Sequence, residues 1–393
     1  MPAIIDSFRA EFLSHGTRAG DVVRAAELDP DCALAQAYAA ALHLSLQTAD
    51  GVAAADAPIA RAVALAGRAD EWERAVVMAF AAWHGDRPTE AAARFTAIVE
   101  SCPRDLISAK FAQLLHINLG DVRGMMRVAN AIDEDAPYAG GLIAFAAEQT
   151  GDIEAAERIG RGATARDADD PWAHHAVAHA VHNRDGPDAV LAWMLPLGDR
   201  WDRCSSFMYT HSWWHVALAH LAQGNHAAAL ALYDDRIWGV RKTYVQDQVN
   251  AISLLARLEL AGADVGDRWN DLADHAAARA ADQLNPFHDF HMLHALLRAG
   301  RIAEARDTIA AIEDRAARID AAEAFPWRAV ALPYARGLSA WAAGDHLSAR
   351  RAFHAATPTL VRGGGSNVQR ELFLAIAADN DRLLAAEGRQ AAA

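Results

Sequence analysis

The segment Gly224-Asn-His-Ala-Ala-Ala-Leu-Ala-Leu-Tyr233 recurs with changes as Gly344-Asp-His-Leu-Ser-Ala-Arg-Arg-Ala-Phe353 and as Gly85-Asp-Arg-Pro-Thr-Glu-Ala-Ala-Ala-Arg-Phe95. Each copy begins with a glycine, continues through small residues and carries an aromatic residue near its end. Small residues let neighbouring helices approach closely, and glycine is the residue that most readily ends a helix. The segment therefore predicts the turn and second helix of a repeated helical hairpin.

The turn glycines recur at a regular spacing along most of the chain. Their successive intervals are 35, 31, 35, 38, 38, 38 and 44 residues, for Gly85, Gly120, Gly151, Gly186, Gly224, Gly262, Gly300 and Gly344. The tetratricopeptide repeat has a period of about 34 residues. This spacing predicts an all-α fold, an α-solenoid of tetratricopeptide-like helix–turn–helix repeats. Pro171, Pro286 and Pro326 should lie at the beginnings of first helices, where proline is tolerated.

We expect one helical-repeat domain over residues 1–393, with the clearest repeats between about residues 70 and 375. The segment Gly363–Ser366 resembles a linker but is too short to separate two domains. No run of about 18 apolar residues suggests a membrane span, and the opening residues lack the basic and apolar regions of a secretory signal. A cytoplasmic location is expected, with a homo-oligomer possible.

Charge and cysteine content narrow the possible partners. The formal net charge is −14, which disfavours binding to nucleic acid or to an anionic membrane, because either would need a basic face. Cys32, Cys102 and Cys204 are widely separated, so they predict neither a disulfide framework nor a thiolate zinc site. No phosphate-binding glycine loop is present, and no cofactor is expected.

Five segments, in order, resemble the signature segments of the tetratricopeptide repeat protein 38 family: Trp172-Ala-His-His175-Ala-Val-Ala-His179, His211-Ser-Trp213-Trp214-His215-Val-Ala-Leu, Val265-Gly-Asp-Arg-Trp269, Phe287-His-Asp289-Phe-His291-Met-Leu and Gly364-Gly-Ser-Asn-Val-Gln-Arg370. The chain departs from the family pattern at His288, where Asn is usual, and at Val368, where Ala is usual. The resemblance implies an all-helical solenoid, but it supplies no set of catalytic residues.

Histidines are concentrated at the starts of three first helices. His175 and His179 are four residues apart, as are His211 and His215, and residues with this spacing lie on the same face of a helix. Their similar distances from the turn glycines, shared by His291, predict that the side chains converge on the concave wall of the solenoid.

We therefore expect a pocket between about residues 172 and 294. Its predicted ligand-binding residues are Trp172, His175, His179, His211, Trp213, Trp214 and Arg370. Several titratable groups among indole rings are typical of a recognition site. The alternative is structural, because these histidines would then hydrogen-bond between repeats in a polar seam, and each tryptophan would be core packing.

The histidine spacing also suits two ligands to one metal ion, with Asp289 or His291 completing a tetrahedral set. However, the segment His175–His179 lacks the glutamate that supplies the base in the zinc-protease helix motif. The sequence therefore predicts that no metal is bound.

A metal-free enzyme is a second possibility. Asp289 would orient a neighbouring histidine, and His215 or His291 would act as general base. No nucleophile stands out, since Cys204 is a lone thiol and Ser366 is better explained as a helix N-cap.

Three functions remain open from the sequence. The leading one is binding of a small molecule or peptide in the pocket. The second is a His/Asp-assisted hydrolase or lyase that uses the same residues. The third is a passive protein-interaction scaffold with an open, shallow groove and no buried titratable cluster.

Overall fold

The computed structural model describes residues 2–392, and within that range it contains helices and no strand. The predicted all-α class is therefore confirmed. None of the helices in this range is both long and apolar enough to cross a lipid bilayer. The chain divides into two compact units, one of residues 2–117 and 121–223 and one of residues 118–120 and 224–392. The prediction of a single domain stays a prediction, and each unit is described by itself.

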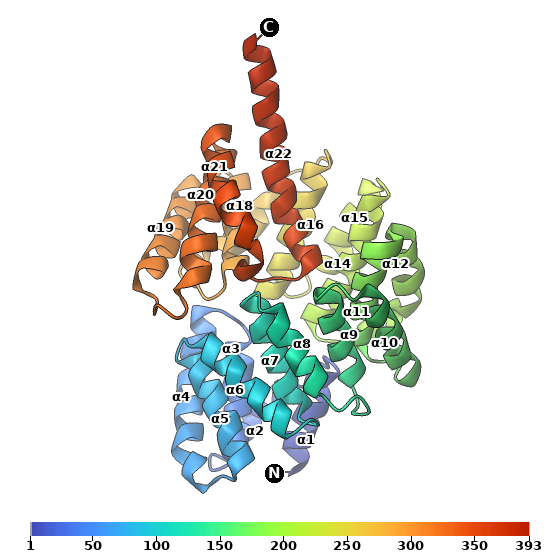
Figure 1. Ribbon diagram of the computed structural model, residues 1–393, viewed down its shortest axis with the longest axis vertical. Helices are drawn as coiled ribbons and strands as arrows, with labels where there is room; N and C mark the ends of the chain where they lie inside the picture. Colours follow the sequence, from blue (N-terminus) through green and yellow to red (C-terminus); the bar gives the residue numbers. More distant parts are fainter. Residues whose placement is uncertain (1, 393) are drawn as a thin grey trace. The chain divides into compact units, whose positions relative to one another are not determined.

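The first unit contains the first fourteen α-helices, most of which pack against the next helix in the chain (Figure 1). Their bounds are α1 Pro2–Leu13, α2 Asp21–Leu28, α3 Ala33–Leu44, α4 Ala49–Leu65, α5 Glu71–His84, α6 Pro88–Ser101, α7 Leu106–Asn118, α8 Val122–Ala131, α9 Ala139–Gln149, α10 Ile153–Arg166, α11 Pro171–Asp185, α12 Pro187–Met194, α13 Gly198–Trp201 and α14 Ser206–Ala222.

The second unit contains the remaining helices, and a π-helical segment, Pro326–Ala331, runs directly into α20. Pro326 thus opens a helix, as predicted. The bounds are α15 His226–Leu232, α16 Val245–Leu260, α17 Arg268–Ala277, α18 Pro286–Arg298, α19 Ile302–Arg318, α20 Leu332–Ala342, α21 His346–Ala356 and α22 Asn367–Ala392.

The repeated turn has a simple chemistry that explains why glycine is followed by Asp or Asn. Gly151 adopts a φ of 91°, a left-handed conformation that ends the first helix. Asp152 then caps the second helix, because its Oδ1 accepts a hydrogen bond of 3.1 Å from the backbone N–H of Ala155. The first hairpin differs, since Gly85 has a φ of −74° and Asp86 takes the left-handed position with a φ of 59°.

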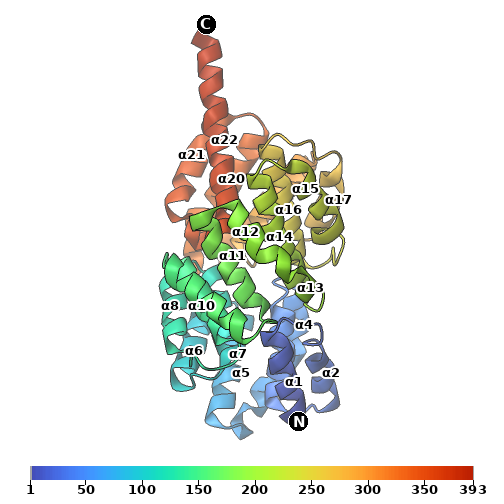
Figure 2. The same cartoon turned by 90° about the vertical axis from the view of Figure 1, so that its right-hand side faces the viewer.

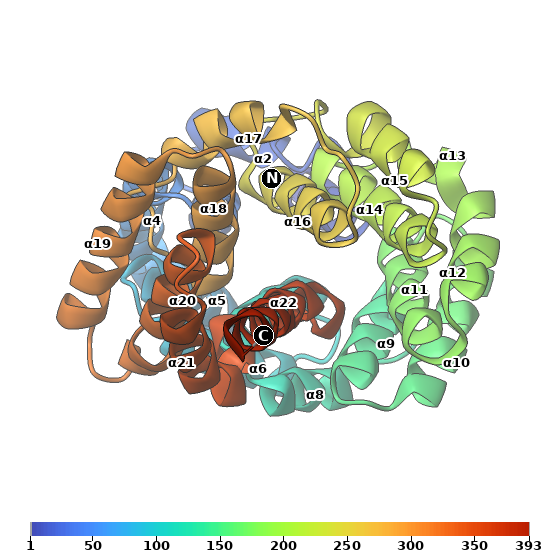
Figure 3. The ribbon, with the colours of Figure 1, turned by 90° about the horizontal axis from the view of Figure 1, so that it is seen from above.

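Helices α9, α11 and α14 are the first helices of consecutive hairpins and determine where the histidines lie. In the first unit α9 packs on α10 and α11, and α11 packs on α12 and α14 (Figures 2 and 3). Apolar contacts between α8, α9 and α11 include Met125, Phe145 and Ala176. Pro171 occupies the first turn of α11, and Asp170 caps that helix through the backbone N–H groups of Trp172 and Ala173, both at 3.1 Å.

A close approach between α9 and α11 depends on Gly141. A β-carbon added there would lie 2.9 Å from the backbone nitrogen of Ala173. Because backbone atoms cannot move aside alone, we expect Gly141→Ala to lower the free energy of unfolding by about 1–3 kcal/mol. Gly162→Ala, on the neighbouring helix α10, should instead raise it by about 0.5–1 kcal/mol, because the nearest atom to an added β-carbon is 3.8 Å away. Urea unfolding of both variants checks these opposite signs, and equal losses would contradict the close-packing explanation.

Candidate functional site

Four histidines converge inside the first unit. His175 and His179 come from α11, and His211 and His215 come from α14. One ligand nitrogen from each side chain lies within 4.8 Å of the others, and all four residues are buried. We call this set the four-histidine cluster. The structure brings these predicted residues together, while their function stays a prediction.

His175 is the centre of the cluster. Its Nε2 lies 3.0 Å from the Nε2 of His179 and 3.0 Å from the Nε2 of His211. The ring of His215 is 5.1 Å from that of His175, 4.7 Å from that of His179 and 5.0 Å from that of His211, centroid to centroid. Three ring nitrogens therefore face one small volume, with the fourth ring beside it.

Electrostatics keep the central imidazole neutral. Burial is the largest cause that holds the pKa of His175 well below its usual range, and His179, His211, His215 and His15 lower it further. A neutral imidazole keeps a lone pair on one ring nitrogen, so it can accept a hydrogen bond or bind a cation.

Aromatic rings enclose the cluster on two sides. The ring of Trp172 lies 4.5 Å from that of His175, and Phe145 lies 5.2 Å from the same imidazole. On α14, Trp214 is fully buried and stacks on His211 with an interplanar angle of 10°. Trp172 and Trp214 therefore contact histidines of the cluster, while their predicted ligand-binding role stays a prediction.

Trp213 lies elsewhere in the first unit. It packs edge-on against Trp201 at 5.2 Å and near Tyr209 at 6.5 Å, because the residue two positions after His211 points to the opposite face of α14. The predicted ligand-binding role of Trp213 thus has no support from these contacts.

A buried carboxyl group on α9, which the sequence-based prediction missed, contacts the four-histidine cluster. The Oε2 of Glu148 lies 3.4 Å from the Nδ1 of His179. Its Oε1 accepts a hydrogen bond of 2.9 Å from the side-chain amide of Asn183, and the side-chain amide of Gln149 donates to its Oε2. The sequence signal is a Glu-Gln pair at the end of an apolar, Ala-rich first helix.

A second missed group links Lys110 on α7 with His15, which follows α1. The Nζ of Lys110 lies 2.9 Å from the Nε2 of His15 and donates to the carbonyl oxygen of Phe12 at 2.6 Å. The His15 ring stacks on Trp172 at 5.3 Å. Burial lowers the pKa of Lys110 to about 7, and Asp170 opposes this shift. The sequence signal is that Lys110 is one of only two lysines in the chain.

The predicted catalytic residues of α18 belong to the second unit. Burial, followed by the charge of Asp282, raises the pKa of Asp289 well above its usual range and so favours its neutral form. Burial lowers the pKa of His291 to about 3, and its Nδ1 lies 2.7 Å from the carbonyl oxygen of Phe287. The expected pocket shared by His215, Asp289 and His291 stays a prediction.

The C-terminal segment of the second unit forms a helix cap. Ser366 accepts a hydrogen bond of 3.3 Å from the backbone N–H of Gln369, whose side chain accepts one of 2.9 Å from the backbone N–H of Ser366. This reciprocal pair confirms the N-cap interpretation. Arg370 donates to Asn367 at 2.6 Å and to the carbonyl oxygen of Gly365, so these contacts fix its guanidinium at the start of α22.

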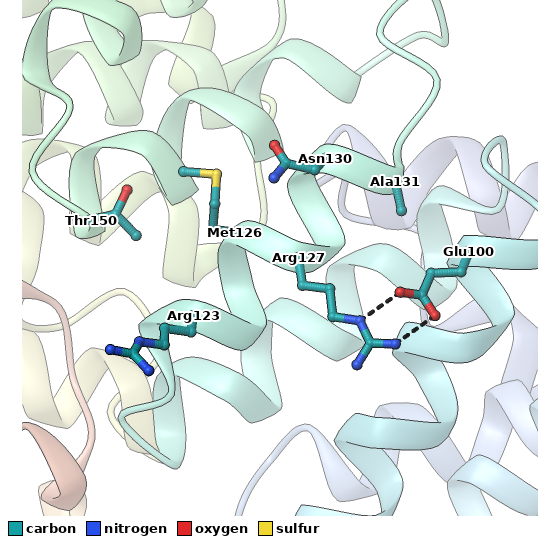
Figure 4. Close-up of a pocket in the computed structure, with 7 residues that line it drawn as sticks. All are labelled: Glu100, Arg123, Met126, Arg127, Asn130, Ala131 and Thr150. Carbon is teal, nitrogen blue, oxygen red and sulfur yellow. Dashed lines mark hydrogen bonds and ion pairs between the residues drawn. The ribbon is translucent and has the colours of Figure 1, made fainter.

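An open hollow on the surface of the first unit lies between α6, α8 and the turn at Thr150 (Figure 4). Met126 and Arg123 are among its lining residues, and Arg127 donates to both carboxylate oxygens of Glu100 at 2.6 and 2.9 Å. Most of the residues that line the hollow are exposed, in contrast to the buried histidines.

No family model matches the chain. Among solved structures, the tetratricopeptide repeat domain of P58(IPK) is similar, at 11% sequence identity and a TM-score of 0.21, covering 81% of this chain and 99% of that one.

Proposed function

We propose that this tetratricopeptide-like helical-repeat protein binds a small ligand at the four-histidine cluster. One observation carries the proposal: four buried imidazoles from two consecutive first helices lie within 4.8 Å of one another. A packed core does not need such a group, because burying a polar side chain costs free energy unless its hydrogen bonds are satisfied. A ligand that uses the imidazole nitrogens would offset this cost.

Two neighbouring polar atoms support the same conclusion. The indole Nε1 of Trp172 and the Nδ1 of His175 are buried and have no hydrogen-bond partner among residues 2–392. Each unsatisfied buried group costs about 1–3 kcal/mol. Such atoms beside aromatic rings are typical of a site that is completed by a bound molecule.

The alternatives have less support. A passive interaction scaffold gives no reason to bury the cluster. The hydrolase or lyase hypothesis depends on a charged carboxylate at Asp289, and burial disfavours that form by raising the pKa of Asp289 well above its usual range. His215 and His291 remain its proposed bases. Membership of the tetratricopeptide repeat protein 38 family, a peptide as ligand, a homo-oligomer and a cytoplasmic location are proposals that rest on the sequence.

Replacing His175 with leucine tests whether the cluster is a binding site or a structural seam. In ligand-free protein we expect His175→Leu to change the free energy of unfolding by less than about 1 kcal/mol, because the substitution also removes a buried, unsatisfied group. His116→Leu is the matched control. His116 is a buried histidine whose ring nitrogens lie 2.9 Å from Thr96 and 2.9 Å from Asp121, and its loss should cost about 1–3 kcal/mol.

Chemical denaturation of both variants gives these values. Native mass spectrometry of the wild type beside His175→Leu should also show whether a bound mass is lost with the imidazole. A loss of stability in His175→Leu as large as in His116→Leu, with identical masses bound, would return the cluster to a structural role.

A further inference from the structure

We propose that His175, His179, His211 and His215 together bind one divalent first-row transition-metal ion, with zinc as the best match. The inference rests on the proposed function, because it names the class of ligand that the cluster binds. It also departs from the expectation drawn from the sequence, which took Asp289 or His291 to complete a tetrahedral set and, with no base glutamate between His175 and His179, predicted that no metal is bound.

The distances suit a tetrahedral site. Zinc binds imidazole nitrogen at about 2.0–2.1 Å, so the nitrogens of a tetrahedral set are about 3.3–3.4 Å apart. In the cluster two such separations are 3.0 Å, and none exceeds 4.8 Å. Each helix supplies two ligands at i and i+4, the spacing that places both side chains on one face. Small side-chain adjustments on two fixed helices therefore complete the geometry.

The histidines cannot make all of the possible hydrogen bonds among themselves at the same time. The carboxylate of Glu148 lies 3.4 Å from the Nδ1 of His179, which favours the tautomer with the proton on Nδ1 and the lone pair on Nε2. That lone pair faces the Nε2 of His175 at 3.0 Å, where a second Nε2, that of His211, lies equally close. A single proton on His175 Nε2 cannot point at both neighbours, whereas a cation at the centre uses every lone pair.

Glu148 also fits the role of an outer-shell carboxylate. Histidines that bind metals almost always donate their other ring N–H to a carboxylate, carbonyl or water, which fixes the ring and strengthens the ligand. Asn183 and Gln149 hold Glu148 in place through its two oxygens. The carboxyl group of Glu148 is fully buried, as an outer-shell group of an enclosed site would be.

The donor set narrows both the metal and its role. Imidazole suits zinc, copper, nickel and iron, whereas magnesium and calcium prefer oxygen. No thiolate belongs to the set. Four protein ligands close a tetrahedral site, so the ion has no open position for a water or a substrate. The structure therefore assigns the metal a stabilising or storage role, and activation of water at this ion is not expected.

Titration of the full chain with zinc tests the inference. Protein stripped with a chelator is titrated in competition with a chromophoric chelator, and the wild type should bind one zinc per chain. His175→Leu and His211→Leu should each weaken binding by more than about 100-fold, and Glu148→Gln by about 10–100-fold. His116→Leu, which alters a buried histidine outside the cluster, should bind as the wild type does. Circular dichroism confirms that each variant is folded.

Two outcomes would overturn the inference. One is a wild type that binds none of zinc, copper, nickel and cobalt at one ion per chain. The other is stoichiometric binding that survives in both His175→Leu and His211→Leu, which would assign the ion to other residues. Either result leaves the broader proposal of a ligand site to be decided by the stability of His175→Leu in the absence of any metal.

Discussion

Zinc at a thousandfold excess over its dissociation constant should raise the free energy of unfolding of the wild type by about 4 kcal/mol. The reason is mass action, because an ion that needs four side chains from α11 and α14 binds the folded chain far better than the unfolded one. Urea unfolding with zinc and with a chelator gives the difference. Scattered histidines in the unfolded chain also bind zinc, and this binding makes the figure an upper value.

The matched variants give this expectation its specificity. His211→Leu should gain less than about 1 kcal/mol from the same zinc concentration, while His116→Leu should gain as much as the wild type. Equal gains in the wild type and in His211→Leu would show that the zinc effect arises outside the four-histidine cluster. If zinc raises the free energy of unfolding of neither protein, the proposed metal site is wrong.

Lys110→Met should abolish a rise in stability that the wild type shows between about pH 7 and pH 10. Burial lowers the pKa of Lys110 to about 7, whereas an unfolded lysine titrates near about 10.4. Between these values the unfolded chain holds a proton that the folded chain has released, so the free energy of unfolding increases with pH. A shift of this size corresponds to a rise on the order of 3–5 kcal/mol, at about 1.36 kcal/mol per pKa unit.

Other titratable groups near Lys110 do not account for the expected difference in pH dependence between the wild type and Lys110→Met. Burial raises the pKa of Asp170 to about 6, so the decrease in the free energy of unfolding that its ionisation causes is complete by about pH 7. Burial raises the pKa of Cys204 to about 11, and its effect on stability is common to both proteins. Burial holds the pKa of His15 well below its usual range, so His15 stays neutral throughout. Urea unfolding of the wild type and the variant from pH 6 to 10 gives the result, and parallel curves would contradict it.

The repeat architecture was predictable because its signals are local. A glycine that ends one helix and an Asp or Asn that caps the next, as at Gly151-Asp152 and Gly224-Asn225, require only the chemistry of neighbouring residues. The pairing of His175 with His179 follows in the same way from the period of one helix. Ser366 as a cap is another local inference that the structure confirms.

The rest of the site depends on contacts between residues distant in sequence. Glu148 on α9 contacts His179 on α11, and His15, in the loop that follows α1, contacts Trp172. Neither contact leaves a spacing signal in the chain. The contact of Trp213 with Trp201 has a simpler cause, since proximity in sequence to His211 does not place two side chains on the same helix face. The pKa shifts of Asp289 and His291 likewise depend on burial, which no spacing in the sequence shows.

X-ray absorption spectroscopy of the zinc-loaded protein tests the central claim most directly, because it measures the ligands of the ion itself. We predict that the zinc ion has a first shell of about four nitrogen atoms at about 2.0–2.1 Å, with the outer-shell scattering that imidazole rings produce. His175→Leu should lose this spectrum. A first shell dominated by oxygen, or one containing sulfur at about 2.3 Å, would contradict binding by His175, His179, His211 and His215.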